Sequence, residues 1–233
     1  QQGGKLQVTV AGVLEAGGFA EGVVVTARRV ETRLSETPQK IEVIDAVDIE
    51  RSVAADLTDL LKKNAGVDVV QYTGALSGIG IRGFRPQTSG INKRSLLLVN
   101  GRPSGVTNLA AMLVDNVERI EVLKGAASAI YGSSAMGGVV NVITRQSFGK
   151  IGGSARIGGG SFGTSEFAAR AGGSASTRLD FDVNAAMFDQ RNDLRMGNGV
   201  VRPATSYSTY DGGGRLGIAL SSGWRLDSRA EIY

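Results

Sequence analysis

The sequence contains no cysteine and no histidine, and it has only four prolines and 6% aromatic residues. The absence of cysteine excludes a disulfide framework, and the absence of both residue types excludes a Cys/His zinc site and a Ser-His-Asp triad within this chain. No run of about 18 apolar residues is present, which excludes a transmembrane helix. A membrane protein is still compatible with this absence, because the short alternating strands of a barrel escape hydropathy analysis.

Glycine is abundant, with 34 residues, and the formal net charge is +4. High glycine with little proline and no triplet repeat predicts many turns and strands, and it argues against collagen or a proline-rich linker. The basic residues are scattered in pairs such as Lys62–Lys63, without a basic stripe or interleaved aromatic residues. This pattern argues against nucleic-acid binding.

The N-terminal part of the chain has little pattern. Residues 1–22 are rich in glycine and alanine, and we expect them to be mobile. The chain begins with QQGG, and we expect its numbering to be that of a mature protein from which a signal peptide was cleaved. The stretch VVVTA, residues 23–27, is a short strand-forming segment with loose chain on both sides.

Residues 41–144 combine short strands with one amphipathic helix. Ser52 is the predicted N-cap of a helix over 53–64, and Gly66 is its predicted stop. The apolar face of this helix carries Val53, Leu57, Leu60 and Leu61. A short alanine-rich helical turn is predicted at 126–131. Strands are predicted at 41–44, 67–71, 78–83, 95–101, 120–123 and 139–144.

Five glycine-separated segments with strand character follow residue 146. In the third, Leu179, Phe181, Val183, Ala185 and Met187 share one face, and Asp180, Asp182, Asn184, Ala186 and Phe188 share the other. Such alternation fits a soluble β-sandwich, with its polar face in water. It fits an outer-membrane barrel equally well, with its apolar face in lipid, and segments of about 10 residues suit a tilted membrane strand.

The pattern G-x-G-x-x-G occurs twice, at Gly78, Gly80, Gly83 and at Gly158, Gly160, Gly163. A dinucleotide site needs a strand before the glycines and a helix after them. Pro86 and Gly90 prevent a helix start after the first match, and the second runs back into glycines. Both matches are therefore interpreted as turns.

Several motifs, in order, resemble TonB-dependent outer-membrane receptors. VVVTA resembles the TonB box. A second set of motifs resembles the plug domain: Pro38 with IEVI, then DLLKKNAGVDV, IRGF, LLLVNGRP and VERIEVLKGAASAIYGSSAMGGVVNVIT. The order and spacing of the motifs match the family over about residues 23–146. The resemblance implies an α+β plug domain followed by antiparallel strands of a transmembrane β-barrel. The implied domains are a mobile segment at 1–22, the TonB box at 23–27, the plug at 38–146 and the first barrel strands at 147–233.

The barrel implied by this resemblance is incomplete in the chain. The family's barrel usually has roughly 22 strands, far more than the residues after position 146 can form. An open sheet in lipid would leave unpaired strand edges. We therefore expect the remaining strands to come from a missing part of the chain or from a second chain.

The resemblance also implies a function. It implies TonB-energised uptake of a scarce ligand, such as a ferric siderophore or a cobalamin-like nutrient, in the outer membrane of a Gram-negative bacterium with the plug facing the periplasm. No enzymatic activity, cofactor, metal or nucleic acid is expected. The expected partners are TonB with its inner-membrane energising complex, outer-membrane lipid and a small-molecule ligand of unknown identity. The alternative is a non-transporting scaffold, one half of a split or repurposed outer-membrane complex.

The resemblance carries four groups of site residues. TonB would bind by strand addition, through main-chain hydrogen bonds. A latch would face barrel carboxylates, unless its arginines are ordinary surface residues. Apical loop residues would contact the ligand, unless they are simply solvated, and glycines would allow tight turns and close approach. These groups are Val23, Val24, Val25, Thr26 and Ala27 for TonB; Arg82, Arg119, Glu118 and Glu121 for the latch; Tyr72, Phe84, Arg85 and Arg94 for the ligand; and Gly132, Gly137 and Gly138 for the turns.

Overall fold

A computed structural model describes most of the chain, and it contains two compact units. The described residues are 6–11, 24–25, 32–33, 41–52, 54, 56–71, 76–86, 94–104, 109, 112–125, 131–220 and 224–232. One unit, here called the mixed unit, comprises residues 17–72 and 76–145. The other, here called the strand unit, comprises residues 1–16, 73–75 and 146–233.

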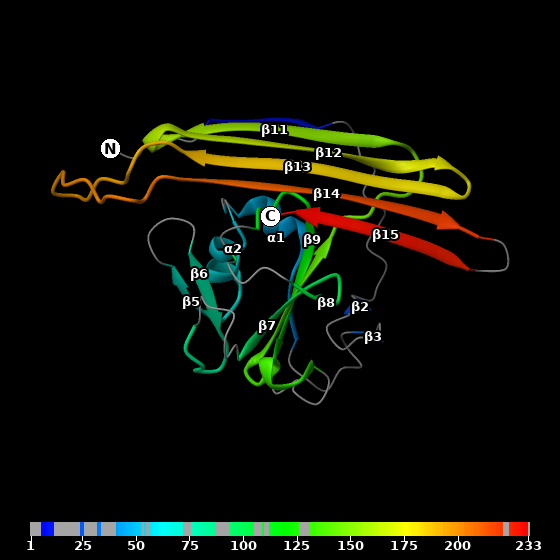
Figure 1. The fold of residues 1–233 in the computed structure, drawn as a ribbon, viewed down its shortest axis with the longest axis horizontal. Coiled ribbons are helices and arrows are strands. Elements are labelled where there is room, and N and C mark those ends of the chain that lie inside the picture. The colour runs from blue at the N-terminus through cyan, green and yellow to red at the C-terminus, as the bar shows by residue number, and fades with distance from the viewer. Residues whose placement is uncertain are drawn as a thin grey trace. The chain divides into compact units, whose positions relative to one another are not determined.

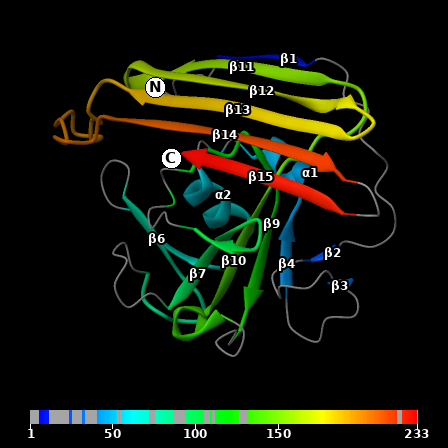
Figure 2. The ribbon, with the colours of Figure 1, turned by 45° about the vertical axis from the view of Figure 1, so that its right-hand side comes forward.

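A five-stranded sheet forms the centre of the mixed unit (Figure 2). Its strands in spatial order are β4 (Ile41–Ile44), β9 (Val117–Lys124), β10 (Gly138–Thr144), β7 (Ser95–Val99) and β8 (Arg102–Pro103). The β-branched strand β10 lies between β9, to which it is antiparallel, and β7, to which it is parallel. Val139, Val140 and Val142 are buried, because a central strand packs on both of its faces.

Two short helices precede the long strands, and the predicted helix start at Ser52 is wrong. α1 (Ala46–Arg51) was not predicted, and Ser52 is its C-cap. α2 (Leu57–Asn64) begins after Asp56, whose carboxylate accepts the Asp59 N–H at 2.9 Å. Leu57, Leu60 and Leu61 are buried, as predicted for the apolar face. Val53 and residues 126–130 of the helical turn predicted at 126–131 lie outside the described residues.

The remaining strands of the mixed unit form two small ladders. β5 (Asp68–Gln71) pairs with β6 (Ser77–Gly80), and β2 (Val24–Val25) pairs with β3 (Thr32–Arg33). The first glycine pattern ends in a turn in which Gly83 has φ 76°, and the second ends in the 3₁₀ turn η4 (Ser161–Gly163), directly before a strand. Neither pattern is followed directly by an α-helix, but the prediction of turns holds only for the last glycine of each. The first two glycines of each pattern lie in strands, in β6 and in β11 (Gly152–Gly160).

Six antiparallel strands form one sheet in the strand unit (Figure 1). Five of them correspond to the five predicted segments, and each pairs with the next in sequence. The sixth, β1 (Leu6–Ala11), pairs with β11, where we had expected mobile chain. Its sequence LQVTVA has strand-forming residues in alternation, which explains the pairing. The others are β11 (Gly152–Gly160), β12 (Thr164–Ser176), β13 (Leu179–Gln190), β14 (Tyr207–Ala219) and β15 (Arg225–Ile232).

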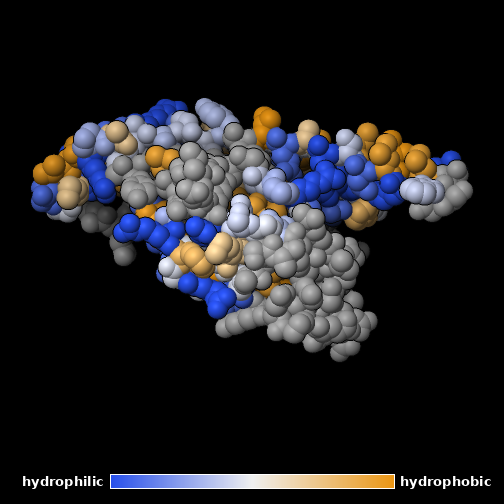
Figure 3. Space-filling model, turned by 60° about the horizontal axis from the view of Figure 1, so that its bottom comes forward, coloured by the Kyte–Doolittle hydropathy of each residue, from blue (hydrophilic) through white to orange (hydrophobic). Residues whose placement is uncertain are grey.

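The two faces of this sheet differ in the way that the alternation predicts. Val183 is 50% exposed and Leu226 56% exposed on the apolar face, whereas Asp180 and Arg215 are buried on the other face. Figure 3 shows exposed hydrophobic residues near both ends of the strand unit. A soluble sandwich would bury the apolar face, so this arrangement favours the barrel interpretation.

Among the described residues, no helix combines the length and the apolar character needed to cross a membrane.

Candidate functional site: a buried polar network in the mixed unit

A carboxylate and an amide meet in the interior of the mixed unit. Glu121 on β9 and Asn141 on β10 are cross-strand partners, and both are fully buried. The Asn141 amide donates to Glu121 Oε2 at 3.2 Å, and Asn141 Oδ1 accepts the Gly101 N–H at 2.9 Å. Arg119 lies within 3.1 Å of Glu121 Oε1. A buried charge is tolerated only when it is paired and hydrogen-bonded, and this network satisfies both conditions.

A second set of contacts holds the end of β10. Asn100 has φ 50°, and its Oδ1 accepts the Thr144 N–H at 3.1 Å. Gly101 follows with φ 77°, so Asn100–Gly101 forms a tight hairpin turn between β7 and β8. Arg145 donates from Nε to the Val117 carbonyl at 3.1 Å. The last residues of the mixed unit are thus fixed to the turn between β7 and β8 and to the start of β9.

The predicted latch residues do not lie together as one group. Arg119 pairs with Glu118 at 2.9 Å and with Glu121, so its guanidinium already has partners inside the mixed unit. Arg82 is instead an exposed turn residue with φ 59°, and it takes part in none of the ion pairs among the described residues. Contact of either arginine with carboxylates of the strand unit stays a prediction.

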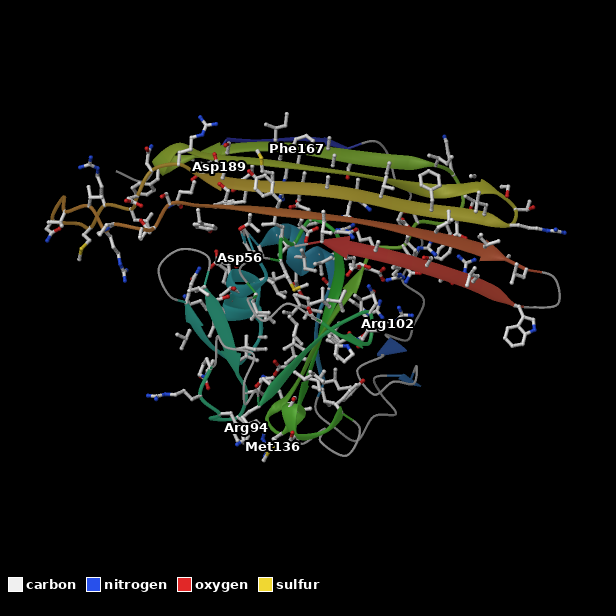
Figure 4. All side chains as sticks on the ribbon, viewed as in Figure 1. Asp56, Arg94, Arg102, Met136, Phe167 and Asp189 are labelled. Atoms are coloured by element: carbon white, nitrogen blue, oxygen red, sulfur yellow. The ribbon has the colours of Figure 1, made fainter. Side chains whose placement is uncertain are left out.

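Two predicted ligand-contact residues and one predicted turn glycine lie together. A Cβ on Gly137 would come within 2.8 Å of Phe84 Cδ2 and 3.2 Å of the Arg94 carbonyl. The Arg94 guanidinium contacts Met136 Sδ at 2.8 Å, and Figure 4 shows both residues at one end of the mixed unit. We call Phe84, Arg94, Met136 and Gly137 the Phe84–Arg94 patch. Arg85 is exposed nearby in sequence, and Tyr72 lies outside the described residues.

The other two predicted glycines have demanding backbone positions. Gly132 has φ 79° at the N-cap of the 3₁₀ turn η3 (Ser133–Ala135). Gly138 has φ 157°, and a Cβ there would lie 2.3 Å from the Leu123 carbonyl. The stretch YGSSAMGG therefore lets the chain turn and then enter a sheet where neighbouring backbone leaves no room for a side chain.

Asp56 is a buried carboxyl that sequence reasoning missed. Burial raises its pKa to about 6, against the opposing hydrogen bond from the Asp59 N–H. Thr58, two residues after Asp56, shares a buried hydroxyl–hydroxyl hydrogen bond of 2.7 Å with Ser77 of β6. Figure 4 shows Asp56 at the opposite end of the mixed unit from Arg94 and Met136. Asp56 directly precedes the apolar face of α2, which is the signal that could have identified it.

Two acidic residues, one at the end of β13 and one in the loop after it, are bound by donors of the protein. Asp189 pairs with Arg191 at 3.0 Å. Asp193 accepts the N–H groups of Thr205 and Ser206, each at 2.8 Å, and these bonds lower its pKa. Among the described residues, no group of three or more acidic side chains could hold a metal ion.

Only part of the predicted TonB box is described. Val24 and Val25 form β2, while Val23, Thr26 and Ala27 lie outside the described residues. In the structure these two residues pair with Arg33 and Thr32 of β3, and pairing with TonB stays a prediction.

The two units together define a class of protein. A mixed domain built around a buried polar network, joined in sequence to antiparallel strands with an exposed apolar face, has the organisation of a plugged outer-membrane barrel. Residues 33–139, a little under half of the chain, match the family model described as TonB-dependent Receptor Plug Domain. The recognition made from the sequence motifs and the predicted fold class are confirmed.

Curated relatives and solved structures agree with this assignment. The chain is 37% identical over 132 residues to the vitamin B12 transporter BtuB of Vibrio cholerae, covering 54% of this chain and 21% of that protein. It is 32% identical over 227 residues to the Vibrio vulnificus vitamin B12 transporter BtuB, covering 83% of this chain and 36% of that protein. The chain thus spans about a fifth to a third of these transporters.

The fold resembles that of solved receptors. The pyoverdine outer membrane receptor FpvA of Pseudomonas aeruginosa aligns with a TM-score of 0.73 at 21% identity, covering 93% of this chain and 30% of the receptor. The ferric yersiniabactin uptake receptor FyuA of Yersinia pestis aligns with a TM-score of 0.70 at 20% identity, covering 83% of this chain and 31% of the receptor. At 20–21% sequence identity, these two alignments show that the folds are similar and nothing more.

Proposed function

We propose that the chain supplies the plug and the first barrel strands of an outer-membrane receptor that imports a scarce nutrient with energy delivered by TonB. The mixed unit is the plug in this proposal, and the strand unit is part of the barrel wall. The observation that carries it is the plug-domain match over residues 33–139, joined to a sheet whose apolar face is exposed. The protein acts as a transporter and has no catalytic role.

Two apolar rows on the exposed face support a membrane position for the strand unit. Ile157, Phe167, Met187 and Tyr210 are successive cross-strand partners in β11 to β14. Leu179, Ile218 and Leu226 form a second row across β13 to β15. Eight residues of β14 separate the rows, which is about 27 Å along the strand and about 20 Å after a tilt of about 40°. That spacing fits the apolar band of an outer-membrane barrel.

Cobalamin is the first ligand to test, and a ferric siderophore is the second. The two curated relatives named above are vitamin B12 transporters, and both solved receptors are receptors for siderophores. The Phe84–Arg94 patch offers an aromatic ring and a cation for either ligand. TonB would pair with residues 23–27 from the periplasmic side, where main-chain hydrogen bonds carry the contact.

Uptake by cells tests this function. Cells without receptors for these ligands, but with TonB, would express the protein and receive labelled cyanocobalamin or a ferric siderophore. We expect one ligand to accumulate, and we expect Val25→Pro to reduce uptake to background, because proline removes a main-chain donor. The matched control Val25→Ala keeps this donor and should retain most of the uptake.

Three other outcomes would change the proposal. Uptake that survives Val25→Pro would show that residues 23–27 do not form the TonB-pairing strand. Uptake that persists in cells without TonB would contradict the energised mechanism. If neither ligand enters and a second chain co-purifies from the outer membrane, the scaffold alternative is correct.

A further inference from the structure

The segment that follows the mixed unit lies against the sheet of the strand unit. The Ser147 N–H donates to Asp182 Oδ1 at 2.8 Å. Gly149 and Ser174 exchange two hydrogen bonds, one from the Gly149 N–H to Ser174 Oγ at 2.9 Å and one from the Ser174 N–H to the Gly149 carbonyl at 2.7 Å. We call residues 147–151 the linker. Contacts to β12 and β13 thus hold it before it enters β11.

Two arginines hold the aromatic ring of the linker. The guanidinium carbons of Arg215 and Arg225 lie 5.0 and 5.5 Å from the centre of the Phe148 ring. Both are within the range of a cation–π contact. Carboxylates from β13 and β15 fix the arginines in place. The ion pairs join Arg215 to Asp180, to Asp182 at 2.8 Å and to Asp227 at 2.8 Å, and Arg225 to Asp180 at 2.6 Å and to Asp227 at 2.8 Å.

Glycines in β12 leave space for the linker. A Cβ on Gly172 would lie 2.9 Å from Ser147 Cβ and 2.4 Å from Asp182 Oδ1. A Cβ on Gly173, which has φ 146°, would lie 2.6 Å from Ile151 Cα. The strand therefore lacks side chains where the linker passes, so the linker is seated on the sheet by shape as well as by charge.

These contacts form a continuous path from the linker into the sheet. Asp182 uses one oxygen for the Ser147 N–H and the other for Arg215 Nε. Arg215 is 6% exposed and is also held by Asp180 and Asp227. A pull on Ser147 is thus transmitted to Asp182, then to Arg215, and from there to β13 and β15. Charge-assisted hydrogen bonds of this kind are the stronger class in proteins.

We propose that this cluster, the linker clamp of Asp180, Asp182, Arg215, Arg225 and Asp227, is a mechanical stop. When force is applied to the chain on the N-terminal side of the mixed unit, unfolding of that unit ends at residues 145–146. The clamp keeps the load from peeling β11 out of the sheet. The inference rests on the proposed function, because TonB is the source of the force in cells.

Single-molecule pulling tests the clamp without TonB. The 233-residue chain has no cysteine, so Thr32→Cys gives a handle that is unique within it, and the protein as the cell makes it is held in its native membrane. We expect extension to pause after roughly 400 Å, the length of chain between positions 32 and 146. Phe148→Ala/Ser174→Ala removes linker contacts and leaves the arginine–aspartate pairs, and it should shorten the lifetime of the pause roughly tenfold to a hundredfold at constant force.

Two further variants make the result specific. Phe167→Ala/Ser165→Ala makes the same two replacements on β12 without touching the linker, and the lifetime should match the parent. Phe148→Trp should lengthen the pause, because tryptophan is the best cation–π partner. Extension past residue 146 without a pause would overturn the clamp. Equal pause lifetimes in Phe148→Ala/Ser174→Ala and in the control Phe167→Ala/Ser165→Ala would overturn it too. Such a result leaves the uptake proposal intact, and loss of TonB-dependent uptake leaves the pulling result intact.

Discussion

Single residues determine how the mixed unit responds to pH. The chain has no histidine, so it has no side chain whose ordinary pKa lies between pH 5 and 8. Among the described residues, Asp56 is the group with a pKa raised to about 6, because burial disfavours its charged form. Between pH 3.8 and about 6 the native state keeps a proton on Asp56 that the unfolded chain has already released, because the ordinary pKa of this side chain is 3.8. Stability of the mixed unit therefore falls as pH rises from about 4 to 6.

Replacing Asp56 by asparagine should remove this pH dependence. The asparagine side chain retains an oxygen for the Asp59 N–H and carries no charge, so the variant should be more stable than the parent above pH 6, by up to about 3 kcal/mol. Urea titration of the protein, followed by proteolysis of the mixed unit at pH 4 and pH 7.5, measures the change.

A second helix cap provides the control for Asp56. Asp45 caps α1 in the same way, with its carboxylate 2.8 Å from the Asp48 N–H, but it is only half-buried. The Asp45→Asn variant keeps Asp56, so the fall in stability that Asp56 causes between about pH 4 and 6 should persist in it. If Asp56→Asn and the parent show the same profile from pH 4 to 7.5, Asp56 does not titrate in that range.

At the scale of elements, the buried polar network fixes the pairing of β9 and β10. A one-residue shift of β10 would move Asn141 away from Glu121 and would bring an apolar side chain opposite a buried carboxylate. The same shift would separate Asn141 from the Gly101 N–H in the turn between β7 and β8. One amide therefore specifies the register of the central strand against both neighbours.

A double-mutant cycle tests this role of the network. Asn141→Leu should lower the free energy of unfolding of the mixed unit by about 2–4 kcal/mol, because it removes a hydrogen bond from a buried charge. In the Glu121→Leu background the same replacement should cost much less, because no buried carboxylate remains to be satisfied. Urea unfolding of the four variants provides the coupling energy. Costs that simply add would show that Asn141 and Glu121 do not act together.

The elements also show how far the sequence could predict the fold. The apolar period identified the buried face of α2 and the positions of the central strands. It could not choose between Ser52 and Asp56 as the cap, because both residue types favour that position. The choice depends on a tertiary contact, the hydrogen bond of 3.0 Å from the Leu57 N–H to the Met112 carbonyl. Glu121 was predicted as a latch residue, but its burial follows from a register that no local pattern reveals.

For the whole molecule, the important property is which face of the strand unit is apolar and exposed. Alternation in the sequence predicted two faces and left open whether the apolar one meets a core or lipid. The structure leaves Val183 half-exposed, midway along β13 between the two apolar rows. The adjacent Asn184 lies on the opposite face and donates to Asp211 at 3.1 Å.

Neighbouring arginine substitutions should have opposite consequences if the apolar face meets lipid. Val183→Arg places a charge at mid-depth and should cost about 2–4 kcal/mol in the free energy of folding into lipid vesicles. Asn184→Arg is the matched control one residue away, and it should cost much less because it faces the polar side and can approach Asp211. A larger cost for Asn184→Arg than for Val183→Arg would show that the apolar face does not meet lipid.

The position of the tryptophan gives the two units different optical properties. Trp224 is the only tryptophan in the chain, and it is 74% exposed beside the second apolar row, directly before β15. Its emission depends on whether that end of the sheet is in water or in lipid. The mixed unit contains no tryptophan, so it can unfold without removing an indole from its surroundings. Within this chain, tryptophan fluorescence therefore reports the surroundings of the strand unit separately from unfolding of the mixed unit.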